Sequence, residues 1–202
     1  MSSTWTARVL NLKVVLTQRG QVSWESLSRA SRKHKNTEKQ VVNNKNKLGK
    51  LHQAELKIFF DSPKTFEMQN IKPLMGLAGL YFIFNKKAII QYPFKTSRLL
   101  YIGMSEKKTN SMGSRLTGHF DGKSKNYGLV NYRKTEQLFF TYINFEMLRK
   151  FWNHRIEDLE SYFILDFVEK YGVYPICNNK SGYEILGKKI NANFRIDWSY
   201  FE

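Results

Sequence analysis

The stretch Gly79-Leu80-Tyr81-Phe82-Ile83-Phe84 is apolar and aromatic throughout, and it is followed by the turn-forming residues Asn85-Lys86-Lys87. A short run of this composition ended by a turn signal favours a β-strand. A second run, Leu99-Leu100-Tyr101-Ile102-Gly103, has the same texture. We therefore expect two strands whose connection includes residues 86–97.

A helix and a third strand are predicted next along the chain. Residues 111–120 form a helix that places Arg115 and His119 one turn apart on one face. Residues 137–145, rich in Phe, Tyr and Ile, form a third strand.

The strongest helix signal covers residues 155–171. Leu159, Phe163 and Phe167 recur at every fourth position, and Gly172 follows as a stop. Residues 71–202 thus read as one α/β (α+β) domain with a three-stranded sheet flanked by helices. The aromatic tail, residues 187–202, is expected to pack back onto it.

Residues 1–70 have a different character and predict a basic, mainly helical module. Trp5, Val9, Leu12 and Leu16 fall at helical spacing, Ser23 is a candidate cap, and Thr37 with Gln40 resembles a capping box. Residues 57–60 read as a short strand. Two interpretations fit: a helix-turn-helix or winged-helix-like module, or a solvated arm that touches only phosphates. The basic residues of this segment are Arg29, Arg32, Lys33, Lys35, Lys39, Lys45, Lys47 and Lys50.

Charge and cysteine content narrow the classes of partner and compartment. Lys and Arg number 33 against 17 Asp and Glu, a net charge of +16, which favours a polyanionic partner, above all nucleic acid. No apolar run is long enough to cross a bilayer. A single cysteine, Cys177, cannot build a disulfide framework. These features predict an intracellular, cytoplasmic protein in a reducing compartment.

A set of short motifs in register carries a resemblance to a known family. The set is Gly79-Leu80-Tyr81, Tyr101-Ile102-Gly103, Arg115 with His119, Glu160 and Asn178. This pattern, over residues 79–182, resembles the GIY-YIG nuclease family, whose order of strands and helices matches the expected order. The resemblance implies a nuclease that hydrolyses DNA with Mg²⁺ or Mn²⁺, one ion per active site.

The resemblance implies a role for each residue of the set. Tyr81 and Tyr101 bring phenols that orient or deprotonate the attacking water, and His119 contacts the first tyrosine and relays its proton. Arg115 binds the scissile phosphate and stabilises its developing charge.

The metal ligand implied by the resemblance is Glu160, and the positioning amide is Asn178. Glu160 lies beside the apolar stripe, where a carboxylate has to be paired, protonated or bound to a cation. Its competitor is Glu157, and that of Asn178 is Asn179.

Two departures from the family pattern are visible. The spacing between Tyr81 and Tyr101 is long, so residues 86–97 are an insertion. Met104 stands where the family often has a lysine, and Lys107 or Lys108 would contact phosphate instead.

The sequence therefore predicts a site-specific, type II restriction-type endonuclease acting on double-stranded DNA. A homing nuclease, a repair or recombination nuclease, and a non-catalytic nucleic-acid-binding protein on the same fold are the alternatives. Because one active site cuts one strand, a double-strand cut implies a homodimer or sequential nicking.

Overall fold

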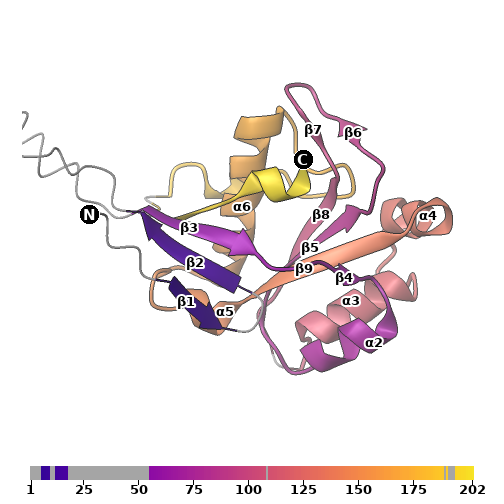
Figure 1. The fold of residues 1–202 in the computed structure, drawn as a ribbon, viewed down its shortest axis with the longest axis horizontal. Coiled ribbons are helices and arrows are strands. Elements are labelled where there is room, and N and C mark those ends of the chain that lie inside the picture. Colours follow the sequence, from indigo (N-terminus) through magenta and orange to yellow (C-terminus); the bar gives the residue numbers. More distant parts are fainter. Residues whose placement is uncertain (1–5, 10–11, 18–54, 108, 189, 191–193) are drawn as a thin grey trace, which may run out of the picture.

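The computed structural model describes residues 6–9, 12–17, 55–107, 109–188, 190 and 194–202 (Figure 1). Its central sheet has the strand order β4-β9-β5-β8, and all its neighbours are antiparallel. The strands are β4 (Lys64–Thr65), β5 (Gly79–Asn85), β8 (Leu99–Ser105) and β9 (Leu138–Asn144). The three predicted strands are confirmed, and the two-residue β4 adds an edge that the sequence did not indicate.

Strand β5 lies between β9 and β8, and every one of its residues is buried. Successive side chains point to opposite faces, so β5 contributes to two cores. Leu80, Phe82 and Phe84 belong to a core shared with α6 (Ile156–Tyr171), which we call the α6 core. Tyr81 and Ile83 belong to a core shared with α3 (Met112–Phe120), which we call the α3 core. Tyr81 is therefore directed toward α3.

Both predicted helices are confirmed, and their ends follow from local chemistry. The Ser111 hydroxyl accepts a hydrogen bond from the Ser114 N–H and caps α3. Helix α6 ends at Gly172, whose φ of 92° suits glycine. In addition, α4 (Tyr127–Thr135), which the sequence reading missed, follows α3 and precedes β9.

The remaining short elements connect these parts. The insertion at residues 86–97 forms a small hairpin of β6 (Ile90–Gln91) and β7 (Thr96–Ser97). Helices α2 (Met68–Ile71) and α5 (Phe145–Leu148) are each four residues long. The 3₁₀ turns are η2 (Lys72–Leu74), η3 (Tyr183–Ile185) and η4 (Trp198–Phe201). In the tail, the buried Phe194, Trp198 and Phe201 pack into the α6 core, as expected.

A second sheet corrects one prediction for the N-terminal region. Its order is β1-β2-β3-β10, from β1 (Thr6–Val9), β2 (Leu12–Thr17), β3 (Glu55–Phe60) and β10 (Phe194–Ile196). The helix predicted from the spacing of Val9, Leu12 and Leu16 is wrong, because this segment contributes two strands that pair with each other, and the second of them, β2, also pairs with β3. Its β-branched residues, among them Val14 and Val15, suit a strand better than a helix.

The expectation of a mainly helical module is not met in the described part of residues 1–70, whose helix is the short α2. The helices predicted at Ser23 and Thr37, and the basic residues between 29 and 50, lie outside the described residues. Strand β3, predicted as residues 57–60, pairs in parallel with β10. The second sheet thus joins segments from both sides of the boundary expected at 70/71, which falls within α2 and stays a prediction.

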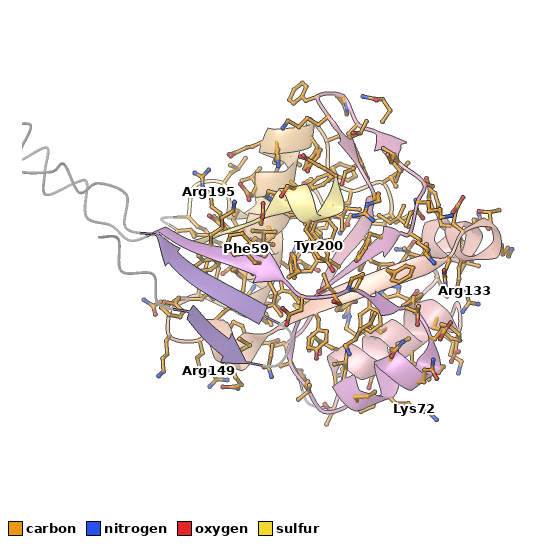
Figure 2. The ribbon with its side chains drawn as sticks, viewed as in Figure 1. Phe59, Lys72, Arg133, Arg149, Arg195 and Tyr200 are labelled. Carbon is orange, nitrogen blue, oxygen red and sulfur yellow. The ribbon has the colours of Figure 1, made fainter. Side chains whose placement is uncertain are left out.

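Basic side chains of the described residues are spread around the molecule. Figure 2 shows the labelled Arg133, Arg149 and Arg195 at well-separated points of its outline. None of the helices in the described residues combines the length and apolarity that crossing a membrane requires.

Candidate active site

A cleft with a volume of about 510 Å³ opens where α3, β8, α6 and the segment 178–180 meet. Five of the six predicted site residues line it, and Tyr81 does not. Tyr81 is fully buried behind the cleft wall. The lining residues are Tyr101, Asn110, Ser114, Arg115, Gly118, His119, Lys123, Ser124, Asn126, Glu160, Asn178, Asn179 and Lys180.

The hydroxyl of Tyr81 joins the two functional side chains of α3. Arg115 Nε donates to Tyr81 Oη over 3.4 Å, and Tyr81 Oη lies 3.2 Å from His119 Nε2. One helical turn separates Arg115 from His119, so both reach the same phenol from one face of α3. The predicted contact between the histidine and the first tyrosine is thus present in the structure.

The direction of the Tyr81–His119 hydrogen bond depends on the protonation state and the tautomer of His119. Burial, and then the positive charge of Arg115, lower the pKa of His119 to about 4. The imidazole is therefore neutral near pH 7. Which partner donates in the Tyr81–His119 pair depends on the tautomer of the ring: when the ring proton is on Nδ1, the Tyr81 hydroxyl donates to His119 Nε2. In this tautomer a polarised chain runs from Arg115 through Tyr81 to His119. The Nδ1 atom is buried and has no partner among the described residues.

Tyr101 lines the cleft beside Arg115 and His119. Its ring lies edge-on to the His119 ring at 4.9 Å and is 6.0 Å from the Tyr81 ring. Burial raises the pKa of Tyr101, and the charge of Glu160 adds to the effect. Burial, followed by Tyr101, raises the pKa of Tyr81 well above its ordinary value. Both phenols are accordingly neutral in the resting protein.

Gly103 is the residue that lets the two tyrosines approach each other. Tyr81 on β5 pairs with Gly103 on β8. A Cβ atom at position 103 would lie 2.6 Å from atoms of both the Tyr81 and Tyr101 side chains. The predicted role of this glycine, a position where a side chain would block a neighbour, has a direct steric cause.

Glu160 brings a carboxylate from α6 to the cleft. The residue is 8% exposed, and burial raises the pKa of its carboxyl while the charge of Lys180 opposes this. Lys180 Nζ lies 3.0 Å from Glu160 Oε2. The competitor Glu157 does not line the cleft and is paired with Arg155 at 2.9 Å. The geometry favours Glu160 over Glu157.

Asn178 acts on the strand that carries Tyr101. Its Oδ1 accepts from the Ile102 N–H over 2.9 Å, and its Nδ2 donates to the Ile102 carbonyl over 2.8 Å. The amide thus ties its own segment to β8, beside Tyr101. Both Asn178 and the neighbouring Asn179 line the cleft.

Lys107, a predicted phosphate contact outside this set, is not brought to the cleft. It is exposed and is not among the lining residues, and Lys108 lies outside the described residues. Lys123 and Lys180 line the cleft instead, and the sequence reading missed both. The position of Lys180, two residues after Asn178, is the signal that could have indicated it.

The cleft offers few side chains that could bind a metal ion. Within the described residues, no three or more His, Cys, Asp or Glu side chains gather into a metal-binding group. Of the described residues that line the cleft, Glu160 is the only acidic one. A hard cation such as Mg²⁺ keeps several waters and is bound by one or two carboxylates plus substrate phosphates. One buried carboxylate facing an open cleft fits that mode and no other.

Comparisons of the chain with models of known protein families, with curated proteins and with solved structures find no match. The resemblance to GIY-YIG nucleases stays a prediction, and it is carried by the residues themselves.

Proposed function

We propose that this protein is a metal-dependent endonuclease of the GIY-YIG type that hydrolyses phosphodiester bonds in double-stranded DNA. The observation that carries the proposal is the polarised chain from Arg115 through Tyr81 to His119, beside a cleft that also holds the Glu160 carboxylate. Phosphodiester hydrolysis calls for three kinds of group, and the cleft has each of them: a cationic donor, a proton path that ends on a neutral base, and a buried carboxylate.

Arg115 is the residue that would hold the scissile phosphate. It lines the cleft, and its guanidinium carries more donors than the Nε–H that Tyr81 accepts. The bond to Tyr81 is long at 3.4 Å, so exchanging it for a charge-assisted bond to phosphate is favourable. This movement also uncovers the Tyr81 oxygen on the cleft side.

The proton of the attacking water would leave along the chain. A preformed Tyr81 phenolate is disfavoured because burial raises the pKa of this phenol. The Tyr81 oxygen therefore takes the proton of the water while its own proton passes to His119 Nε2, which is neutral and 3.2 Å away. Tyr101, half-buried at the cleft wall, orients the water.

Glu160 would hold the divalent ion, Mg²⁺ or Mn²⁺. When bound, such an ion supplies Lewis-acid stabilisation of the charge on the phosphate and the leaving oxygen. The charge of Glu160 also raises the pKa of Tyr101, which keeps that phenol protonated.

The finer proposal is a site-specific, restriction-type enzyme. It is supported by the basic segment at residues 29–50, by the net charge of +16 and by the insertion between the two tyrosine-bearing strands. A double-strand break by this chain would require a homodimer or two successive nicks.

The proposal is tested by incubating the full chain with supercoiled plasmid in Mg²⁺, in Mn²⁺ and in EDTA. We expect cutting with either metal and none in EDTA, and sequencing of the ends would reveal any defined site. An intact plasmid under all conditions, together with a shifted band in a gel, would identify a non-catalytic nucleic-acid-binding protein and overturn the proposal. Equal cutting in EDTA would refute the metal requirement.

A further inference from the structure

Helix α6 carries two buried carboxylates, each paired with a lysine from the segment that follows the helix. Lys180 Nζ lies 3.0 Å from Glu160 Oε2, and Lys188 Nζ lies 2.6 Å from Asp158 Oδ1. The two acidic side chains are almost equally buried, at 10% and 11% exposure. The pairs differ in location, because only the Lys180–Glu160 pair lines the cleft.

The Lys180 ammonium already pairs with one oxygen of the carboxylate that would hold a metal ion. It contacts Glu160 Oε2 and approaches the Glu157 carbonyl oxygen at 3.4 Å. A divalent ion on the same carboxylate would lie beside this ammonium and be repelled by it, strongly so at a site shielded from water. Lysine, with a flexible four-carbon stem, can release the carboxylate without moving the backbone, and its side chain is 31% exposed.

A displaced Lys180 side chain would find no second carboxylate in the cleft. Glu160 is the only acidic residue among the described residues that line it. Glu184, the next acid along the chain, does not line the cleft, although its charge contributes to raising the pKa of Glu160. Arg115 and Lys123 line the same cleft, so the anion suited to it is a phosphate of the bound strand.

We propose that Lys180 is the resident cation of the Glu160 carboxylate and that a divalent metal ion displaces it onto a backbone phosphate of the nucleic acid. This inference rests on the proposed function for its phosphate and on the Lys180–Glu160 pair for the exchange. Lys180 is thus a further catalytic residue, which couples metal binding to binding of the substrate phosphate.

The exchange is tested without DNA by titrating Mn²⁺ into the full chain in a calorimeter. Lys180→Met removes the competing cation, so Mn²⁺ should bind about tenfold tighter, a change of about 1.4 kcal/mol. Lys188→Met removes the same charge from the matched pair at Asp158 and should bind Mn²⁺ like the wild type. Glu160→Gln should abolish binding. Equal Mn²⁺ affinity in the wild type and in Lys180→Met would overturn the exchange, as would a complete lack of Mn²⁺ binding by both.

The transfer of Lys180 to a phosphate is tested by the salt dependence of binding to a 30-base-pair duplex, with and without Ca²⁺. Each lysine–phosphate contact contributes about 0.9 to the slope of log Kd against log salt. Lys180→Met should lower that slope by about one unit only when Ca²⁺ is present, because without it Lys180 stays on Glu160. A slope change of the same size in both conditions, or in neither, would overturn the displacement.

Two further measurements keep the outcomes apart. Circular dichroism and a Lys180→Gln variant show whether the changes come from folding or from the charge. Plasmid cleavage by the wild type is measured in parallel: its absence, with the Mn²⁺ and salt results as expected, would defeat the proposed function and leave the exchange intact. Plasmid cleavage by the wild type, together with unchanged Mn²⁺ affinity in Lys180→Met, would leave the proposed function intact and defeat the exchange.

Discussion

Replacing Tyr81 with phenylalanine tests the polarised chain at its centre. The change removes one oxygen and keeps the ring in the α3 core. Two hydrogen bonds are lost, the 3.4 Å bond from Arg115 Nε and the 3.2 Å bond to His119 Nε2. Both are long, so at a net value of about 0.5–1.5 kcal/mol each we expect the free energy of unfolding to fall by about 1–2 kcal/mol. Cleavage should fall much further, by about 10²- to 10⁴-fold, because the proton path to His119 is cut.

Tyr171→Phe is the matched control for this variant. Tyr171 is also fully buried, and its hydroxyl likewise has two partners within reach, which share its one proton: the Trp198 carbonyl at 3.4 Å and Glu202 Oε1 at 3.0 Å. It belongs to the α6 core and does not line the cleft. Urea denaturation should show a similar loss of stability in both variants, and single-turnover plasmid cleavage should be lost in Tyr81→Phe only. If Tyr81→Phe cut DNA within a few-fold of the wild-type rate, the chain would not be the proton path.

Three other outcomes are expected. Glu160→Gln should lower the cleavage rate by several powers of ten and leave duplex affinity intact; Glu157→Gln, measured in the same plasmid assay, should cut normally. Because the pKa of His119 is about 4 in the folded protein against an ordinary 6.5, the unfolded chain binds more protons between these values. Stability should therefore decrease as the pH falls from 6.5 toward 4, and His119→Gln should lose that part of the slope in urea titrations at several pH values. Gly103→Ala forces a Cβ atom to within 2.6 Å of both tyrosine side chains and should cost about 1–3 kcal/mol in denaturation experiments. Gly118→Ala, where the nearest atom is 4.0 Å away, should be neutral or stabilising, and equal losses in the two would contradict the steric argument.

The parts of the fold that could be predicted are those specified by local chemistry. β5 is apolar and aromatic up to Phe84, α3 has a serine cap, and α6 has an apolar stripe with a glycine stop. These signals lie within each element, so they can be recognised without knowing which other elements pack against it. They also place Arg115 and His119 on one face of α3, which is why most of the candidate site was predictable.

The errors come from contacts between distant residues. The helix predicted around Val9–Leu16 became two strands because a partner strand, β3, begins at residue 55, and periodicity in a short apolar run does not separate the two outcomes. The Lys180–Glu160 pair was missed because it joins a helix to a loop twenty residues later. The depressed pKa of His119 depends on burial, which no local pattern reports.

The resting cleft holds its charged and titratable groups in pairs that a substrate would have to separate. Arg115 is bound to a phenol and Lys180 to a carboxylate, so each cation has a partner before any phosphate arrives. Such pairing stabilises groups that are partly withdrawn from water and would otherwise be costly to bury. The same pairing lowers the affinity of the cleft for a lone anion or a lone metal ion. Under the proposed function, DNA and the metal together would relieve both pairs, since the phosphate would take the two cations and the metal would take the carboxylate. We therefore expect Mn²⁺ and duplex to strengthen each other's binding, a reciprocal coupling that should shrink when Lys180 is replaced by methionine.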